Sequence, residues 1–205
     1  MTDQLTTVRG IARHPWLNSP DTKFDADGLY KVTLELPAAA AAPLIAEYTA
    51  LQRKAMADYQ AQKKGKKATA TDLPITPKLD EDLNETGMYE LKVKMKASGT
   101  SQRTGKPYTR KLPLFDSFGN PTNAQVGGGS EINVSFKASP WSNAKGECSV
   151  TCYLEAVQVI RLVTGGAASS DRFGFGKVDG GFAATEEQAD AGTSSKDGAS
   201  SYDFD

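Results

Sequence analysis

The stretch MYELKVKMKA, from Met88 to Ala97, carries the clearest strand pattern in the chain. Apolar and basic side chains alternate along it, which is typical of a half-buried strand. The apolar positions are Leu91, Val93, Met95 and Ala97, and the basic positions are Lys92, Lys94 and Lys96. Successive lysines on one face lie about 6.6 Å apart. Because like charges in a row repel one another, the pattern indicates an anionic partner or an edge strand protected against aggregation.

The basic character continues beyond this strand, which favours the anionic partner. From Lys92 to Lys111 the chain has no acid, and the further basic residues are Arg103, Lys106, Arg110 and Lys111. Aromatic residues accompany them, namely Tyr89, Tyr108 and Trp141, the last in the polar stretch SPWSNAKG, where we expect a loop and an exposed ring. A basic groove with aromatic platforms is typical of sequence-tolerant binding to single-stranded nucleic acid. For Phe115 and Phe136 we expect core positions instead.

Further elements follow on both sides of this stretch. Strands are predicted at about Leu5–Ala12, Leu29–Leu36, Tyr108–Phe115, Ile132–Ala138 and Glu147–Val163, with Tyr108–Phe115 pairing with the basic strand. Apolar residues at spacings of three and four predict a helix over Pro43–Gln62, with Gly65 as its cap. Residues 68–87, which contain Pro74 and Pro77, are predicted to be a long irregular connection.

Five or six antiparallel strands with one inserted helix, in about 160 residues, fit a small all-β barrel, and the OB-fold, a five-stranded Greek-key barrel, is one of this class. We expect residues 1–164 to form this domain. Residues 165–205 differ in composition, since Gly, Ser and Ala make up half of them and they carry a net charge of −5. Such a segment is predicted to be a disordered acidic tail. Its end, Tyr202-Asp203-Phe204-Asp205, serves either as a solubilising tail or as a docking peptide.

Little in the sequence favours an enzyme. His14 is the only histidine, and we interpret it as an ordinary strand-end or surface residue. Cys148 and Cys152, four residues apart on one strand, would lie too far apart for a disulfide, so two reduced, buried thiols are expected. The chain offers too few such ligands for a structural zinc site, and no cofactor is predicted. With no signal sequence and no apolar span, we expect a cytoplasmic protein without membrane contact.

Four segments resemble one known family, the single-stranded DNA-binding proteins of short-tailed, T7-like phages. They are GLYKVTLELP (Gly28–Pro37), LKVKMKAS (Leu91–Ser98), LPLFDSFGN (Leu112–Asn120) and GGGSEINVSFKASPW (Gly127–Trp141). The inserted helix with its basic end and the acidic, aromatic-ended tail resemble the family as well. The resemblance implies an OB-fold that binds and anneals single-stranded DNA in phage replication, recombination and repair, in the cytoplasm of the infected bacterium.

The resemblance also implies partners and site residues. It assigns DNA contacts to Lys64, Lys66 and Lys67 after the helix, to Lys92 and Lys94, and to Trp141. It implies a tail that contacts the phage DNA polymerase and helicase-primase through Tyr202, Asp203, Phe204 and Asp205, and a possible homodimer. Together with the residue pattern, the predicted DNA-binding set is Lys64, Lys66, Lys67, Lys92, Lys94, Lys96, Arg103, Lys106, Tyr108, Arg110, Lys111 and Trp141.

The leading hypothesis is therefore a non-enzymatic, sequence-nonspecific single-stranded DNA-binding protein. Charge and aromatics alone equally suit an RNA-binding OB protein or RNA chaperone, because discrimination between DNA and RNA depends on contacts to the 2′-hydroxyl. A third hypothesis, from another class, is a phage adaptor that uses its basic face to bind an acidic host protein.

Overall fold

The structure is a computed structural model that describes residues 5–64, 66–101 and 103–164. The chain divides into two units, Met1–Ala167 and Ala168–Asp205. The predicted acidic tail, with its aromatic end, lies outside the described residues. The elements are β1 (Thr6–Asp21), β2 (Leu29–Pro37), α1 (Ala38–Gln62), β3 (Thr69–Ala70), β4 (Ile75–Leu79), β5 (Glu85–Lys96), β6 (Ser98–Thr100), β7 (Pro107–Thr109), β8 (Leu114–Phe115), β9 (Glu131–Ser142) and β10 (Glu147–Arg161).

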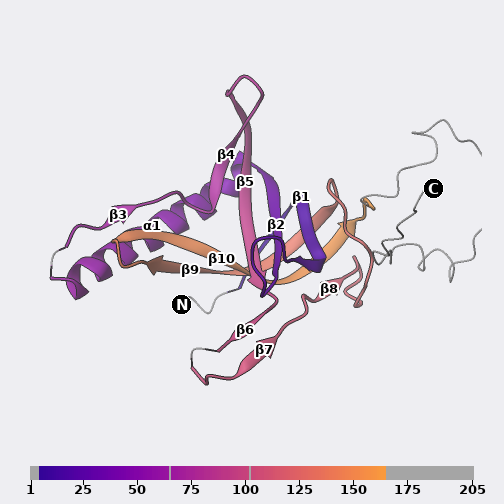
Figure 1. Ribbon diagram of the computed structural model, residues 1–205. Helices are drawn as coiled ribbons and strands as arrows, with labels where there is room; N and C mark the ends of the chain where they lie inside the picture. Colours follow the sequence, from indigo (N-terminus) through magenta and orange to yellow (C-terminus); the bar gives the residue numbers. More distant parts are fainter. Residues whose placement is uncertain (1–4, 65, 102, 165–205) are drawn as a thin grey trace, which may run out of the picture. The chain divides into compact units, whose positions relative to one another are not determined.

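The five long strands close into a barrel in the order β1, β2, β5, β10, β9 and back to β1 (Figure 1). Neighbours are antiparallel except β5 and β10, which run parallel. An odd number of strands cannot alternate in direction all the way round a closed barrel, so one parallel pair is unavoidable. The purely antiparallel set expected from the sequence is therefore wrong in this pairing, and the short strands β3 and β8 also pair with β10 in parallel. The OB-fold with one inserted helix, here between β2 and β5, is confirmed.

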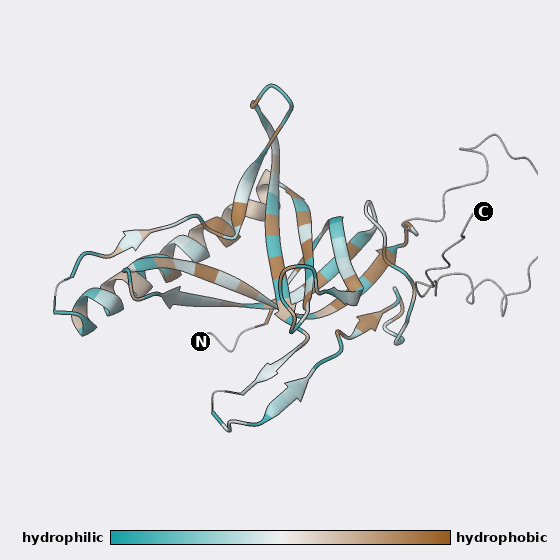
Figure 2. Cartoon of the chain, viewed as in Figure 1, coloured by the Kyte–Doolittle hydropathy of each residue, from teal (hydrophilic) through white to brown (hydrophobic). Residues whose placement is uncertain are grey.

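Alternation along the strands produces the core. Leu91, Val93 and Met95 of β5 are buried, while the lysines between them are exposed. Hydrophobic and hydrophilic bands alternate along this strand (Figure 2). On β9 the predicted inward positions, Phe136 among them, are buried as well. On β10 the alternation shifts at a bulge between Leu154 and Ala156, after which the other set of residues points inward.

The N-terminal strand is longer than predicted, since β1 continues to Asp21 instead of ending near Ala12. Both Ala12 and Leu17 are buried, although alternation alone would turn residues five apart to opposite faces. A bulge between Arg13 and Trp16 adds the extra residue that this change of face requires.

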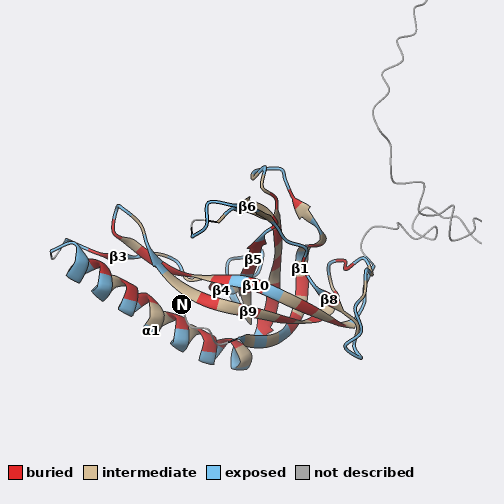
Figure 3. Cartoon of the chain, turned by 90° about the horizontal axis from the view of Figure 1, so that it is seen from below, coloured by how far each residue is buried: buried red, intermediate tan, exposed pale blue. Residues whose placement is uncertain are grey.

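The helix α1 begins at Ala38, five residues before the predicted start, because the alanine run favours helix. Pro43 therefore lies inside the helix, where it cannot donate a main-chain hydrogen bond. Its buried side faces the strands and its exposed side faces solvent (Figure 3). The buried positions are Ala41, Leu44, Tyr48, Gln52, Ala55 and Tyr59. At the C-terminus Lys63 caps the helix and Lys64 adopts the left-handed conformation, with φ of 50°. The predicted cap, Gly65, lies outside the described residues.

Two connections differ from the predictions. Residues 68–87 are not an irregular connection, since β4 pairs with β5 in a hairpin whose turn spans residues 80–84. Pro77 is tolerated in β4 because this strand lies at the edge of the sheet, and Pro74 precedes the strand. Tyr108–Phe115 is not a partner of the basic strand either. Instead, β7 pairs with β6 in a separate small hairpin, and β8 pairs with β10.

The two cysteines are free and buried, as predicted from their spacing. Burial raises the pKa of the Cys152 thiol to about 11, which keeps it protonated at neutral pH. In the part of the chain that the structure describes, no helix is both long and apolar enough to cross a membrane.

Candidate nucleic-acid interface

A groove of about 500 Å³ crosses the outer face of β1, β2, β5, β10 and the end of β9. In an OB-fold the face of the second and third barrel strands, which are β2 and β5 here, binds oligonucleotides. The outward side chains of this groove include Lys31, Thr33, Lys92, Lys94, Trp141 and Thr151. Cations and one large aromatic ring therefore share a single open cleft.

The cations gather because of strand register. Lys31 of β2 lies directly opposite Lys94 of β5, and Thr33 lies opposite Lys92. Like charges placed opposite each other across a sheet destabilise it. Asp21 relieves part of this repulsion, since the Lys31 Nζ lies 2.6 Å from its carboxylate oxygen. Among the described residues no acid forms an ion pair with Lys92 or Lys94, so these two ammonium groups are free to bind an anion.

Trp141 stands on the strand β9 rather than in the predicted loop, because β9 continues to Ser142. It pairs with Ser149 of β10, which also lines the groove. Trp141 is 38% exposed, in agreement with the exposed position predicted for it. A strand holds the ring more firmly than a loop does, as a stacking platform requires.

One wall of the groove is the segment from Asp72 to Pro74, between β3 and β4. Buried Gln52 of α1 donates its amide to the carbonyl oxygens of Thr71, at 2.6 Å, and Cys148, at 2.9 Å. The Ser149 hydroxyl donates to the Asp72 carbonyl, and the Lys92 amide donates to the Pro74 carbonyl. The helix and both flanking strands thus hold this wall in place.

The lysines after the helix lie at the far end of β10 from Lys94. The Thr69 amide donates to the Gly146 carbonyl in the turn between β9 and β10. Gly146 has φ of 84°, and a Cβ atom there would lie 2.6 Å from the Lys67 carbonyl oxygen, so only glycine permits this approach. From Gly146 to Tyr153, which is opposite Lys94, the strand spans about 23 Å. Trp141 pairs between these two levels, while Lys64, Lys66 and Lys67 are exposed near the turn.

The remaining predicted cations lie elsewhere. Lys96 forms ion pairs with Asp25, at 3.5 Å, and Asp27, at 3.1 Å, and the hydrogen bond to Asp27 raises the pKa of its ammonium group. This acidic pair interrupts the row of lysines. Beyond it, exposed Arg103, Lys106, Arg110 and Lys111 lie on the β6–β7 hairpin and the segment after it. The Arg110 guanidinium stacks over the Tyr108 ring, 4.7 Å from its centroid.

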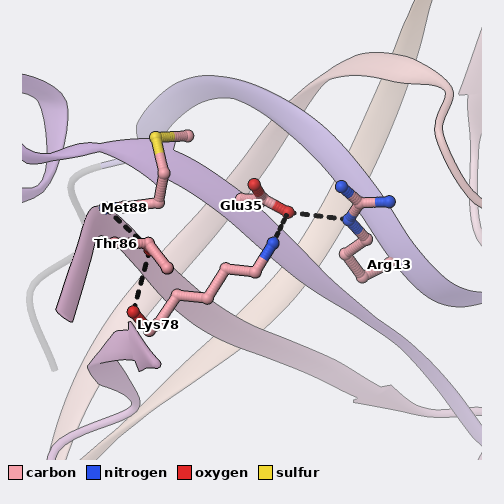
Figure 4. A network of polar contacts seen from close by, with 5 residues as sticks. All are labelled: Arg13, Glu35, Lys78, Thr86 and Met88. Carbon is pink, nitrogen blue, oxygen red and sulfur yellow. Dashed lines mark hydrogen bonds and ion pairs between the residues drawn. The ribbon is translucent and has the colours of Figure 1, made fainter. Parts of the chain in front are cut away.

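Next to the groove, a buried carboxylate ties three strands together (Figure 4). Glu35 of β2 accepts the Nζ of Lys78 on β4 at 2.8 Å and the Nε of Arg13 on β1 at 2.7 Å. The Lys78 hydrogen bond, with that of Arg13, holds the pKa of the Glu35 carboxyl below its usual 4.5. The network fixes the edge of the sheet on which the groove rests.

Comparison with known proteins bears on this arrangement. No family model and no curated protein sequence matches the chain. The crystal structure of gp2.5, a single-stranded DNA-binding protein encoded by bacteriophage T7, matches with a TM-score of 0.67 and 25% identity, over 82% of this chain and 98% of that one. This chain has the fold of a phage single-stranded DNA-binding protein. The resemblance that the sequence motifs indicated is confirmed.

A second phage single-stranded DNA-binding protein, from bacteriophage Enc34, has been solved in complex with ssDNA. It matches with a TM-score of 0.53 and 14% identity, over 78% of this chain and 88% of that one. The same protein without its C-terminus matches with a TM-score of 0.50, also at 14% identity. At this level of identity the likeness concerns the fold alone.

The predicted DNA-binding residues fall into groups according to their position relative to the groove. Lys92, Lys94 and Trp141 line the groove, and the post-helix lysines lie beyond the Trp141 end of it. Lys96 is paired with acids, and the hairpin cations form a separate basic surface. The residues of the tail lie outside the described part of the chain.

Lys31 and His14 line the groove, although neither is in the DNA-binding set predicted from the sequence. The alternation in the strand Leu29–Leu36 placed Lys31 on the outward face. Its position beside the other lysines depends on the pairing of this strand with the basic strand. No sequence signal pointed to His14, because it reaches the groove through a bulge in β1 that is defined only by the pairing with β2.

Proposed function

We propose that this protein binds single-stranded DNA, without sequence preference, in the groove across β2 and β5. The observation that carries the proposal is the meeting of Lys92, Lys94 and Trp141 in one open cleft of an OB barrel. The T7 protein of similar fold is a single-stranded DNA-binding protein by name, and the Enc34 protein was solved with ssDNA. Both facts support the same ligand for this chain.

In this proposal, lysines bind the phosphates of the DNA and Trp141 binds a base. The free ammonium groups of Lys92 and Lys94 neutralise phosphates, and Lys31 adds a third cation that Asp21 orients. The Trp141 ring offers a flat face to a base. Because every base has a π-face, stacking of this kind tolerates any sequence. Nothing in this scheme reads base edges, so the binding is nonspecific.

Further parts of the proposal depend on the sequence resemblance. We propose that the protein protects and anneals single strands during phage replication, recombination and repair in the cytoplasm of the infected host. The acidic tail would recruit the phage DNA polymerase and helicase-primase, and the chain would form homodimers. The exposed hairpin cations would contact DNA that leaves the groove.

The first test is a fluorescence titration of the full-length protein with a ~30-nucleotide single strand and its duplex at two salt concentrations. We expect quenching by the single strand, weaker binding to the duplex and a marked loss of affinity at higher salt. If about four phosphates are neutralised, log K against log salt has a slope of about −3. A flat salt response would reject the groove as a phosphate site.

The alternative functions are outcomes of the same series. Preference for an RNA oligonucleotide over matched DNA would favour an RNA-binding protein. No binding to either nucleic acid, also after removal of the tail, would favour the adaptor that binds an acidic protein.

A further inference from the structure

The groove has an aromatic ring on one side and a second ring on the other. Trp141 comes from β9, while exposed His14 comes from β1, and both line the groove. Along this face β10, β5 and β2 lie between them. Four strand spacings make about 19 Å on a flat sheet, and less on a curved one. The lysines occupy the space between the two rings.

The position of His14 results from the bulge in β1. Arg13 pairs with Thr33, and Trp16 pairs with Lys31, so three steps along β1 oppose two along β2. The extra residue lets Ala12 and Leu17 both point into the core. Within this bulge, His14 adopts the left-handed backbone conformation, with φ of 48°.

The backbone at His14 is strained, although histidine, like asparagine and aspartate, adopts positive φ more often than most residues with a side chain. A left-handed residue is easiest as glycine, and asparagine or aspartate tolerate it well. His14 also precedes Pro15, and a proline favours extended backbone in the residue before it. Such strain persists only where the surroundings enforce it, and it concentrates at binding sites.

The surroundings do enforce it on both sides. The Nε of Arg13 lies 2.7 Å from the Glu35 carboxylate, which anchors the residue before His14. Trp16, two residues later, resumes the pairing with β2. The imidazole is thus presented to the groove from a fixed backbone rather than from a mobile loop.

We propose that His14 is a second stacking platform for single-stranded DNA, at the side of the groove opposite Trp141. A single strand would run across the lysines with one base on the indole and another on the imidazole. This inference deepens the proposed function and depends on it. It predicts that the ring of His14, and not its backbone conformation, contributes to affinity.

The test compares wild-type protein with His14→Gly and His14→Asn, two residues that suit a left-handed backbone. Binding of a labelled ~30-nucleotide single strand is followed by anisotropy, and folding by thermal denaturation. We expect both variants to be as stable as the wild type or more so, with affinity reduced about fivefold. The salt slope should stay unchanged, because stacking releases no counterions. Trp16→Phe, an exposed ring on β1 outside the groove, is the matched control and should keep its affinity.

Several results would overturn the inference. Folded variants with wild-type affinity would show that the ring does not touch DNA. Retained affinity in His14→Asn alone, or a smaller salt slope in both variants, would indicate a hydrogen bond or a charge instead of stacking. No binding by the wild type would overturn the proposed function, and this inference with it.

A second measurement needs no variant. His14 is the only histidine of the chain, so its ring protons give unambiguous NMR signals in the unmodified protein. Stacking under a base should move these signals upfield as single-stranded DNA is added. Signals that do not move at saturating DNA would contradict the proposal, even if other residues respond.

Discussion

Trp141 illustrates how a single residue acquires a role through its neighbours. Its indole is partly exposed on a strand, between the turn that holds the post-helix lysines and the paired strands that hold Lys92 and Lys94. An exposed aromatic ring is unremarkable by itself on a protein surface. Beside unpaired cations in a groove, it is the ring that we propose as a platform for a base.

Replacing Trp141 by alanine should therefore weaken binding of single-stranded DNA by about 1–3 kcal/mol, or roughly 5- to 150-fold. Binding is measured by the fluorescence anisotropy of a labelled oligonucleotide, because the variant lacks the tryptophan whose fluorescence DNA is expected to quench. Trp16→Phe leaves Trp141 as the remaining tryptophan and should keep both the affinity and the quenching. Equal affinities of wild type and Trp141→Ala would remove the indole from the site.

Glu35 acts at the same scale but on stability. Its folded-state pKa is lowered by the hydrogen bonds from Lys78 and Arg13. A carboxyl with a depressed folded pKa contributes stability above its unfolded pKa, and this contribution disappears as the pH falls through the folded value. We expect Glu35→Gln to reduce the free energy of unfolding by about 1–2 kcal/mol at pH 7.

The difference in unfolding free energy between wild type and Glu35→Gln should narrow as the pH falls below about 4.5, where the unfolded carboxyl takes up a proton. It should vanish below the lower pKa of the folded carboxyl. Urea denaturation at several pH values measures it. Glu131→Gln is the matched control, because its ion pair with Arg9 is largely exposed and should contribute little. If the difference in unfolding free energy stayed constant with pH, the charge of Glu35 would not contribute to the stability of the network.

At the scale of elements, α1 does more than cover the barrel. It faces β9 and β10 with its apolar side, yet one buried position is the polar Gln52. The amide of this residue bonds two main-chain carbonyls, at Thr71 and Cys148, and so joins the helix to the groove wall. The inserted helix is thereby linked to the site, although it contributes no side chain to the groove lining.

Gln52→Leu should cost about 1–2 kcal/mol in unfolding free energy, since it leaves the Thr71 carbonyl without its donor. The loosened wall should also lower the affinity for single-stranded DNA two- to fivefold. Urea denaturation and anisotropy measure the two effects. Gln60→Leu, on the exposed side of the same helix, should change neither property. An unchanged midpoint for Gln52→Leu would show that the wall is held without the helix.

At the scale of the whole molecule, charge is distributed unevenly along the chain. The net charge of −1 is the sum of a basic barrel sequence and an acidic terminal segment. Opposite charges on one chain compete with an external polyanion for the same cations. The barrel's affinity for DNA should therefore depend on whether the terminal segment is present.

Deletion of residues 185–205 should raise the affinity for single-stranded DNA at low salt, and the gain should shrink as salt screens the charges. Anisotropy titrations of full-length and shortened protein measure this. A full-length variant with the acids of that segment changed to amides should show the same gain. Equal affinities of all three proteins at low salt would contradict competition by the tail.

For half-buried strands, the local sequence pattern was sufficient to predict which side chains face the core. The alternation in Leu29–Leu36 and Met88–Ala97 predicted which side chains face the core, because side-chain direction has a period of two in any strand. It failed where pairing overrides the local signal. The proline-containing strand β4, the extension of β9 through Trp141 and the bulge at His14 all depend on a neighbouring strand.

The sequence by itself determined the inward faces of the strands Leu29–Leu36 and Met88–Ala97, the concentration of positive charge between Lys92 and Lys111, and the presence of one helix between two strands. Only the tertiary structure decided which of these charges act together. Lys31 lies opposite Lys94 through the register of β2 and β5, while Lys96 pairs with acids. Closure of the barrel places Trp141 and His14 on opposite sides of one groove. Register and closure join residues far apart in the chain, so no local pattern of residues contains them.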